Sequence, residues 1–304
     1  MLHLPLAQGV LDRAAHLRVD ESALEELMLA GIYYQFRDQR WVTTKGTLTQ
    51  FSYSEIQTLA DAGELYFLGL ESGQIGHFLF NAPILQDQFD PEELLSLRDI
   101  AAQLSFLQIG IAVHGQALAL WHNSHRFCSR CGLETFPIQS GSIRSCSQDH
   151  QHHPRTDPAI IVLIRDRDDR IMLGHQATWP ERRFSAFAGF VEPGESFESA
   201  VLREVAEESG IQVRELRYLG SQPWPFPASV MVAYEVIADN PEDARADGLE
   251  ITEVKWWTRA QLKSESDSGE LILPPKISVA RAMIDRWFSE KSDESLGGED
   301  QWRN

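Results

Sequence analysis

Three glutamates, Glu204, Glu207 and Glu208, lie within five positions of the stretch LREVAEESG. If residues 197–209 form a helix, these side chains occupy positions i, i+3 and i+4 and share one face. Like charges on one face repel each other, and a Mg²⁺ or Mn²⁺ ion held by the carboxylates would offset that repulsion. The alternative is a solvated acidic helix face, which is common in a protein this acidic.

The residues that flank the glutamates would position this helix, in the stretch GFVEPGESFESAVLREVAEESGI that begins at Gly189. Gly189 lets the backbone turn tightly before the helix, and Gly210 suits the C-terminal end of the helix. We expect Arg203 to pair with Glu195 and to hold the turn against the helix, which is a structural role rather than a catalytic one.

The whole stretch resembles the Nudix box, G-x5-E-x7-R-E-U-x-E-E-x-G-U with U apolar, at every fixed position. The resemblance implies an α/β fold, the Nudix α/β/α sandwich with a mixed sheet, and hydrolysis of a diphosphate linked to another group. It implies that Glu204, Glu207 and Glu208 are catalytic and bind Mg²⁺ or Mn²⁺, with the carbonyl of Ala188 as a further ligand. Bound metal would neutralise the diphosphate oxygens and lower the pKa of a water molecule.

A proline-rich stretch, SQPWPFPAS, follows ten residues after the box. Its prolines fix a stiff loop, whose aromatic residues could either stack on a ring or tuck into the core. The stretch resembles the SQPWPFPxS signature of the NADH pyrophosphatase branch of the Nudix family, which makes NAD(H) the implied substrate. The residues implied to line its site are Gln222, Pro223, Trp224, Pro225, Phe226, Pro227, Ala228 and Ser229.

Further segments resemble the same branch and imply more site residues. LPPKISVAR resembles its closing segment, in which Ala280 would touch the substrate, and Glu250 occupies the place of another metal-binding glutamate. Glu253 is a rival to Glu250, and surface charge would also explain either residue. In HPRTDPAII, His153 stands where the branch usually has a tyrosine that stacks on nicotinamide opposite Phe190. The smaller imidazole ring predicts weaker selectivity for NAD(H) over other dinucleotides.

The stretch HNSHRFCSRCG resembles the start of the zinc ribbon of this branch, which carries CxxC followed by a second CxxC. Cys128, Cys131 and Cys146 fit, but Asp149 stands in the place of the fourth cysteine and His150 comes next. Because structural zinc favours Cys and His ligands, we favour His150 as the fourth ligand over its rival Asp149. The alternative is that zinc has been lost and the three thiols are simply buried.

The order of apolar and polar runs, together with the resemblance described above, implies four segments. They are an α+β N-terminal domain over 1–122, a zinc-ribbon-like segment over 123–157, a Nudix hydrolase domain over 158–290 and a flexible acidic tail over 291–304. In the first, GELYFLGL and IGHFLF predict strands and a helical stretch is expected from Pro91. In the third, AIIVLI, IMLGHQ, SVMVAYEV and EVKWW predict strands, and ISVARAMIDRWF predicts a helix.

Composition narrows the class of protein. The 304 residues carry a formal net charge of −18, which disfavours broad binding to nucleic acids or anionic membranes. No apolar run is long enough to span a bilayer, the N-terminal residues lack a secretory pattern, and three cysteines do not suggest a disulfide framework. We therefore expect a cytoplasmic protein, and the resemblance implies a homodimer.

The expected function is hydrolysis of NAD⁺ or NADH to NMN(H) and AMP by attack of water at phosphorus. The branch also implies removal of NAD caps from the 5′ ends of RNA, which would use the same residues. The alternative is a non-catalytic NAD sensor or a zinc-ribbon interaction module. Such a protein would have no need for the complete set of box carboxylates.

Overall fold

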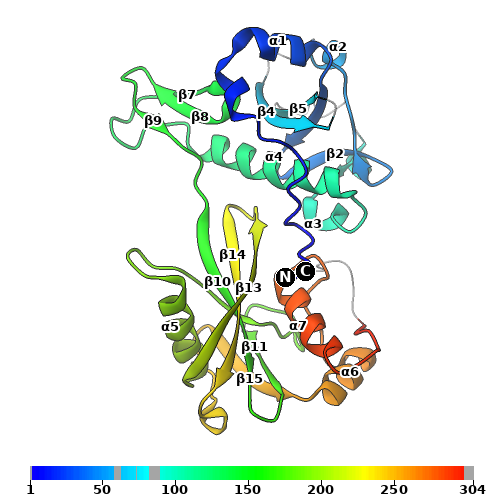
Figure 1. Cartoon of the computed structure of the whole chain (residues 1–304), viewed down its shortest axis with the longest axis vertical. Helices are drawn as coiled ribbons and strands as arrows, with labels where there is room; N and C mark the ends of the chain where they lie inside the picture. Colours follow the sequence, from blue (N-terminus) through cyan, green and yellow to red (C-terminus); the bar gives the residue numbers. More distant parts are fainter. Residues whose placement is uncertain (1, 58–62, 73, 82–89, 298–304) are drawn as a thin grey trace. The chain divides into compact units, whose positions relative to one another are not determined.

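A computed structural model of the chain describes residues 2–57, 63–72, 74–81 and 90–297, which form two compact units (Figure 1). The N-terminal unit comprises Gln8–Thr156 and Trp224–Ala228. The C-terminal unit comprises Met1–Ala7, Asp157–Pro223 and Ser229–Asn304.

The N-terminal unit is built on a mixed six-stranded sheet of order β3-β2-β1-β5-β4, with β6 paired to β2. β1 and β5 run parallel, and the other pairs are antiparallel. The strands are β1 (Ile32–Arg37), β2 (Arg40–Thr44), β3 (Thr47–Leu48), β4 (Glu64–Glu71), β5 (Ile75–Asn81) and β6 (Leu94–Leu95). The predicted strands GELYFLGL and IGHFLF are thus confirmed as β4 and β5.

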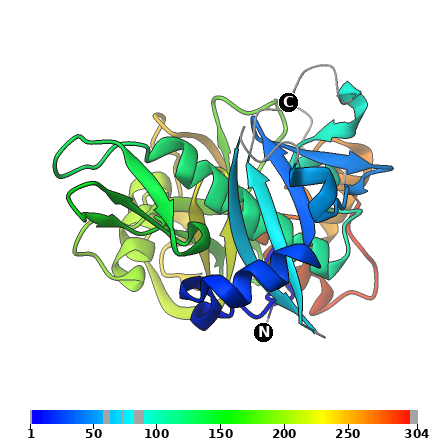
Figure 2. The same cartoon turned by 90° about the horizontal axis from the view of Figure 1, so that it is seen from above.

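Helices cover both faces of this sheet (Figure 2). On one face, Tyr33 packs with Leu24 of α1 (Glu21–Leu29) and with α2 (Tyr53–Ile56). On the other, the indole of Trp41 donates a hydrogen bond to Gln116 of α4 (Phe106–Ser124). A Cβ at Gly115 would lie 2.8 Å from the Trp41 ring, so this glycine allows the close approach of helix and sheet.

The helical stretch expected from Pro91 is divided into separate helices with a short strand between them. A short 3₁₀ helix, η3 (Pro91–Glu93), is followed by β6, α3 (Leu97–Ile100) and α4. Ser96 and Ser105 accept hydrogen bonds from backbone N–H groups at the starts of α3 and α4. These N-caps begin two separate helices where the apolar pattern alone suggests one.

A three-stranded ribbon of order β7-β8-β9 belongs to the same unit. Arg144 of the ribbon donates a hydrogen bond of 2.8 Å to Nδ1 of His122 in α4, and the His122 ring stacks on Tyr66 of β4. Burial lowers the pKa of His122 to about 4, so the ring stays neutral and accepts from Arg144. The ribbon elements are β7 (Thr135–Ile138), η4 (Gln139–Gly141), β8 (Ile143–Cys146) and β9 (Gln151–His152).

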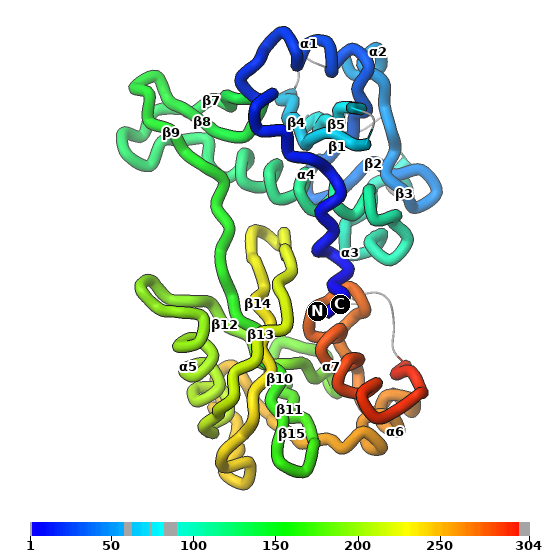
Figure 3. The backbone as a smooth tube through the Cα atoms, in the orientation of Figure 1, coloured from blue at the N-terminus to red at the C-terminus, as the bar shows by residue number. Residues whose placement is uncertain are grey.

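The C-terminal unit contains a second mixed sheet, of order β13-β14-β10-β11-β15, with β12 also paired to β10. β10 runs parallel to β14 and antiparallel to β11 and β12 (Figure 3). The strands are β10 (Asp157–Arg165), β11 (Ile171–Gln176), β12 (Phe187–Phe190), β13 (Val213–Trp224), β14 (Ser229–Ala238) and β15 (Ile251–Trp257). The four strands predicted in this segment are confirmed as β10, β11, β14 and β15.

Alternation along β10 explains why helices cover both faces of this sheet. Ile160 and Val162 face a core formed with α5 (Phe197–Ser209), whereas Ile161 faces a core formed with α7 (Val279–Ser289). The remaining helices are α6 (Arg259–Ser268) and the 3₁₀ helices η1 (Ala15–Val19) and η5 (Pro241–Asp243). The expected α/β/α sandwich with a mixed sheet is confirmed.

Part of the segment expected to form a flexible tail is packed. Leu296 is buried in the core with α7, and its carbonyl accepts a hydrogen bond of 3.0 Å from Arg281. The rest of that prediction, over 298–304, falls outside the described residues. Within the described chain, no helix combines the length and the apolar character needed to cross a membrane.

Candidate functional site

Helix α5 carries the clustered glutamates, and it spans the predicted residues 197–209. Ser196 caps its N-terminus, and Gly210 ends it with a φ of 68°, a left-handed conformation that glycine adopts without strain. Val201 and Val205 are fully buried on its inner face. Burial of these valines fixes the rotation of the helix and thereby the direction of the glutamates.

Arg203 connects the glycine turn to the helix, as the sequence predicts. Its guanidinium donates two hydrogen bonds of 2.9 Å to Glu195, which lower the pKa of that carboxyl to about 2. It also donates to the carbonyl of Phe190 and to the carboxylates of Glu204 and Glu207. One cation therefore offsets the charge of three of the acidic groups in the box.

Glu208 has a different environment. It is 3% exposed, and its Oε2 atom is buried with no hydrogen-bond partner among the described residues. Burial, followed by the charges of Glu204 and Glu250, raises the pKa of Glu208 to about 8. A buried carboxylate oxygen without a donor, beside other carboxylates, suits a hard divalent cation. The chemistry of Glu208 therefore fits the metal that the sequence implies, but among the described residues the ligand atoms of Glu204, Glu208 and Glu250 do not all lie within 4.8 Å of one another.

Strand β12 approaches the same carboxylates from the sheet. A Cβ at Gly189 would lie 2.0 Å from the carboxylate of Glu204, so no larger residue fits without displacing that group. Ala188, the predicted carbonyl ligand, precedes this glycine and pairs with Ile161 of β10. Burial raises the pKa of Glu204, which again indicates a carboxylate that is poorly solvated.

Glu250 is held at the start of β15 by a turn that the sequence analysis missed. The carboxylate of Asp247 accepts hydrogen bonds from the backbone N–H groups of Leu249, Glu250 and Ile251. Glu250 is close enough to raise the pKa of both Glu204 and Glu208, and its side chain is exposed. The signal that could have revealed the turn is Asp-Gly within RADGLE, since aspartate readily bonds backbone N–H groups two to four residues on.

The proline-rich stretch forms the end of β13, a turn and the start of β14. Gln222 is fully buried and donates to the carbonyl of Ile277, so it ties β13 to the turn that precedes α7. The guanidinium of Arg98 lies 4.4 Å from the ring centre of Phe226, which itself contacts Trp224 edge to face at 4.9 Å. Both aromatic rings are half-buried.

Three other predicted substrate contacts differ in exposure. Phe190 is 61% exposed at the end of β12, whereas Ala280 is 4% exposed in α7. His153 lines a cavity in the N-terminal unit, so it belongs to a different unit from Phe190. Their joint stacking on nicotinamide stays a prediction.

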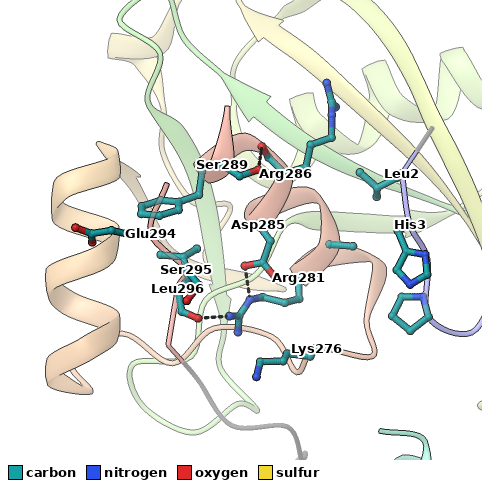
Figure 4. Close-up of a pocket in the computed structure, with 13 residues that line it drawn as sticks. Leu2, His3, Lys276, Arg281, Asp285, Arg286, Ser289, Glu294, Ser295 and Leu296 are labelled. Carbon is teal, nitrogen blue, oxygen red and sulfur yellow. Dashed lines mark hydrogen bonds and ion pairs between the residues drawn. The ribbon is translucent and has the colours of Figure 1, made fainter. Parts of the chain in front are cut away.

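A cavity of about 590 Å³ beside α7 contains none of the predicted substrate residues. Figure 4 shows Arg281 within it, hydrogen-bonded to Asp285 and to the carbonyl of Leu296. The carbonyls of Pro274 and Gly297 accept its other N–H groups. Protein acceptors thus occupy this buried guanidinium.

The zinc-ligand candidates meet in the ribbon. The ligand atoms of Cys128, Cys131, Cys146 and His150 all lie within 4.8 Å of one another, and Asp149 is not part of this group. Although burial opposes the charged form, backbone N–H groups and the ring of His152 lower the pKa of Cys128 to about 5. A thiolate at neutral pH is the form that zinc requires.

Comparison with known proteins decides the family. The chain is 40% identical over 237 residues to the NAD-capped RNA hydrolase NudC of Mycobacterium bovis, covering 74% of this chain and 75% of that one. The same figures hold for the NAD-capped RNA hydrolase NudC of Mycobacterium tuberculosis. The NUDIX domain family matches residues 155–273. The chain belongs to the Nudix hydrolase family.

This Nudix hydrolase also carries the accessory domain of one branch. The NADH pyrophosphatase zinc ribbon domain matches residues 123–153, which confirms the predicted family and its branch. Among solved structures, the chain is similar to a Nudix hydrolase from Nitrosomonas europaea with 19% identity. That match has a TM-score of 0.44 and covers 57% of this chain and 96% of the other.

Proposed function

We propose that this Nudix hydrolase cleaves the diphosphate of NAD⁺ and NADH, giving NMN or NMNH and AMP. The observation that carries the proposal is Glu208, a buried carboxylate with an unpartnered oxygen beside Glu204 and Glu250. The ribbon match and the relatives that are named as NAD-capped RNA hydrolases support a substrate that contains NAD.

The residues divide the work of the reaction. Glu204, Glu208 and Glu250, with the carbonyl of Ala188, would hold Mg²⁺ or Mn²⁺, which when bound neutralises the diphosphate oxygens and acidifies a water molecule. Glu207 has a side chain that is 60% exposed, so it can accept a proton from the attacking water. Water adds to one phosphorus, the bond from that phosphorus to the bridging oxygen breaks, and each product keeps one phosphate. Arg203, which pairs with Glu195, holds the carboxylates of Glu204 and Glu207 in position.

The test is product analysis with NADH and either Mg²⁺ or Mn²⁺, scoring NMNH and AMP by chromatography. Glu207→Gln should lose activity by about 100-fold or more while keeping the fold, since a general base contributes factors of this size. A folded wild-type protein that forms neither product with either metal would overturn the proposal and favour the NAD-sensor alternative.

Glu250 and its rival Glu253 provide a matched pair of variants. Glu250 raises the pKa of Glu208, whereas Glu253 is an exposed residue within β15. Glu250→Gln should raise the Mg²⁺ concentration for half-maximal rate by about tenfold, as expected for loss of one charged ligand. Glu253→Gln should leave it unchanged, and the reverse result would transfer the ligand role to Glu253.

The same residues support removal of NAD caps from RNA, because the bond that is cut is the same. Incubation with an NAD-capped transcript should yield 5′-monophosphate ends in wild type and not in Glu207→Gln.

Zinc held by the three cysteines and His150 would stabilise the ribbon. We further infer that the protein is a cytoplasmic homodimer. Size-exclusion chromatography coupled to light scattering would test the oligomeric state.

A further inference from the structure

The loop Trp224–Ala228 belongs by its contacts to the N-terminal unit, although the residues on either side of it belong to the C-terminal unit. The prolines of its PWPFP stretch have no N–H group, so the backbone offers few hydrogen bonds that could fix the loop. Within the loop, Phe226 donates a backbone hydrogen bond of 2.7 Å to the carbonyl of Trp224. Side-chain contacts from the N-terminal unit therefore have a large part in setting its conformation.

Gln116 of α4 makes a direct hydrogen bond to this loop. The residue is 2% exposed, and its Nε2 atom donates to the carbonyl of Pro225 over 2.7 Å. Its Oε1 atom accepts a hydrogen bond of 3.3 Å from the indole of Trp41 in β2. Because a buried amide group that loses a partner is unfavourable, the two bonds together orient the amide and keep its donor at Pro225.

Arg98 of α3 contacts the aromatic rings of the same loop. Its guanidinium carbon lies 4.4 Å from the ring centre of Phe226 and 5.9 Å from the ring of Trp224. Burial lowers the pKa of Arg98, which indicates a guanidinium partly withdrawn from water, and a cation attracts a ring more strongly in that state. Since Trp224 also meets Phe226 edge to face, one guanidinium restrains both rings.

We propose that Arg98 and Gln116 are positioning residues that hold Trp224 and Phe226 as a preformed surface for a flat ring of the dinucleotide. This role rests on the proposed function, under which the loop lines the substrate site. Both rings are half-buried, so each keeps surface that a substrate ring can cover. A loop that is fixed beforehand loses little conformational freedom when the substrate binds. Removal of either positioning residue should therefore weaken binding of the dinucleotide rather than slow the attack at phosphorus.

Steady-state hydrolysis of NADH tests the role of the guanidinium. Arg98→Met should raise KM by about 3- to 10-fold and leave kcat within about twofold of wild type, because loss of binding shared by ground state and transition state acts on KM. Arg98→Lys should recover most of the affinity, since an ammonium is also attracted to a ring face. Arg37→Met is the matched control, because Arg37 is a half-buried arginine of the same unit that pairs with Asp38, and it should keep both constants.

Gln116→Leu tests the hydrogen bond to the loop and should raise KM in the same way. Gln108→Leu on the same helix is its control, since Gln108 makes no side-chain hydrogen bond with the residues that the structure describes. Calorimetric titration of NADH into Glu207→Gln measures affinity without turnover. Addition of Arg98→Met to that protein should weaken NADH binding by the same factor of about 3 to 10.

A melting curve for each variant verifies folding, and the Arg98 variants decide the result if Gln116→Leu does not fold. Wild type that forms neither NMNH nor AMP would refute the proposed function, and the calorimetric comparison would still test the loop. Equal NADH affinity with and without Arg98→Met, or no NADH binding to Glu207→Gln, would overturn the positioning role. The same conclusion would follow if folded Arg98→Met kept the wild-type KM or lost only kcat, or if Arg98→Lys were as impaired as Arg98→Met.

Discussion

Substitution of Gly189 by alanine tests how tightly strand β12 packs against the carboxylate of Glu204. The added Cβ would lie 2.0 Å from the carboxylate carbon, and carbon atoms in contact are about 3.5 Å apart, so the carboxylate must withdraw by roughly 1.5 Å. The φ of Gly189 is outside the left-handed region, so alanine can adopt the backbone conformation. The defect should therefore arise from the side-chain collision alone.

A displacement of this size has a large expected effect on rate. Misplacement of a catalytic group by about 1 Å can cost about 100-fold, so we expect kcat for NADH to fall by about that factor. Stability should change little, since a tolerated Gly→Ala change alters the free energy of unfolding by about 1 kcal/mol or less. The assay is NADH hydrolysis across a range of Mg²⁺ concentrations, with a melting curve for each variant.

Two further variants make the test specific. Gly9→Ala is the matched control, because nothing lies within 4 Å of the Cβ it would add, and it should retain wild-type kcat. In a Glu204→Ala background, Gly189→Ala should add no further loss, because the group it collides with is gone. The reasoning is wrong if Gly189→Ala keeps kcat within about twofold of wild type. It is also wrong if adding Gly189→Ala to Glu204→Ala lowers kcat by a further factor of about 100.

Glu208 should make the metal-free protein less stable as the pH rises from about 5 to 8, because its folded pKa of about 8 exceeds its unfolded value and the folded state holds the extra proton. Denaturant melts at several pH values should show this slope, and both Mg²⁺ and Glu208→Gln should reduce it. His150→Ala should lower the zinc content measured by elemental analysis, whereas Asp149→Ala should not; the opposite pattern would make aspartate the ligand. His153→Tyr should raise kcat/KM for NADH relative to ADP-ribose or FAD by about 3- to 10-fold, and no change would show that the ring at this position does not set selectivity.

The sequence predicts the C-terminal unit well because its signals are local. The spacing of the glutamates and the valines of α5 defines one helix and its buried face, and the apolar run of β10 is long enough to identify a central strand. Glycine at position 210 also predicts where the helix ends, since glycine adopts the left-handed conformation at a helix C-terminus at little cost. The division between α3 and α4 could not be predicted this way, because a serine cap competes with a continuous apolar pattern.

Features that depend on distant contacts were harder to predict. Glu250 and its rival Glu253 differ by three positions in sequence, and only the Asp247 turn and the nearby carboxylates distinguish them. Gln222 looked like a loop residue, yet its amide is buried against the carbonyl of Ile277, 55 residues away.

The exposure of the three carboxylates supports one of the two explanations for clustered glutamates on one helix. A solvated acidic face would expose each carboxylate, and Glu207 alone has that character, with a side chain that is 60% exposed. Arg203 offsets the charge on Glu195, Glu204 and Glu207, but none of its described hydrogen bonds reaches Glu208. The repulsion is therefore concentrated on the most buried carboxylate of the set, where water cannot screen it. If a divalent cation binds there, as we propose, it would offset this repulsion and stabilise the folded protein. Metal affinity and the instability of the metal-free site would then have the same physical origin.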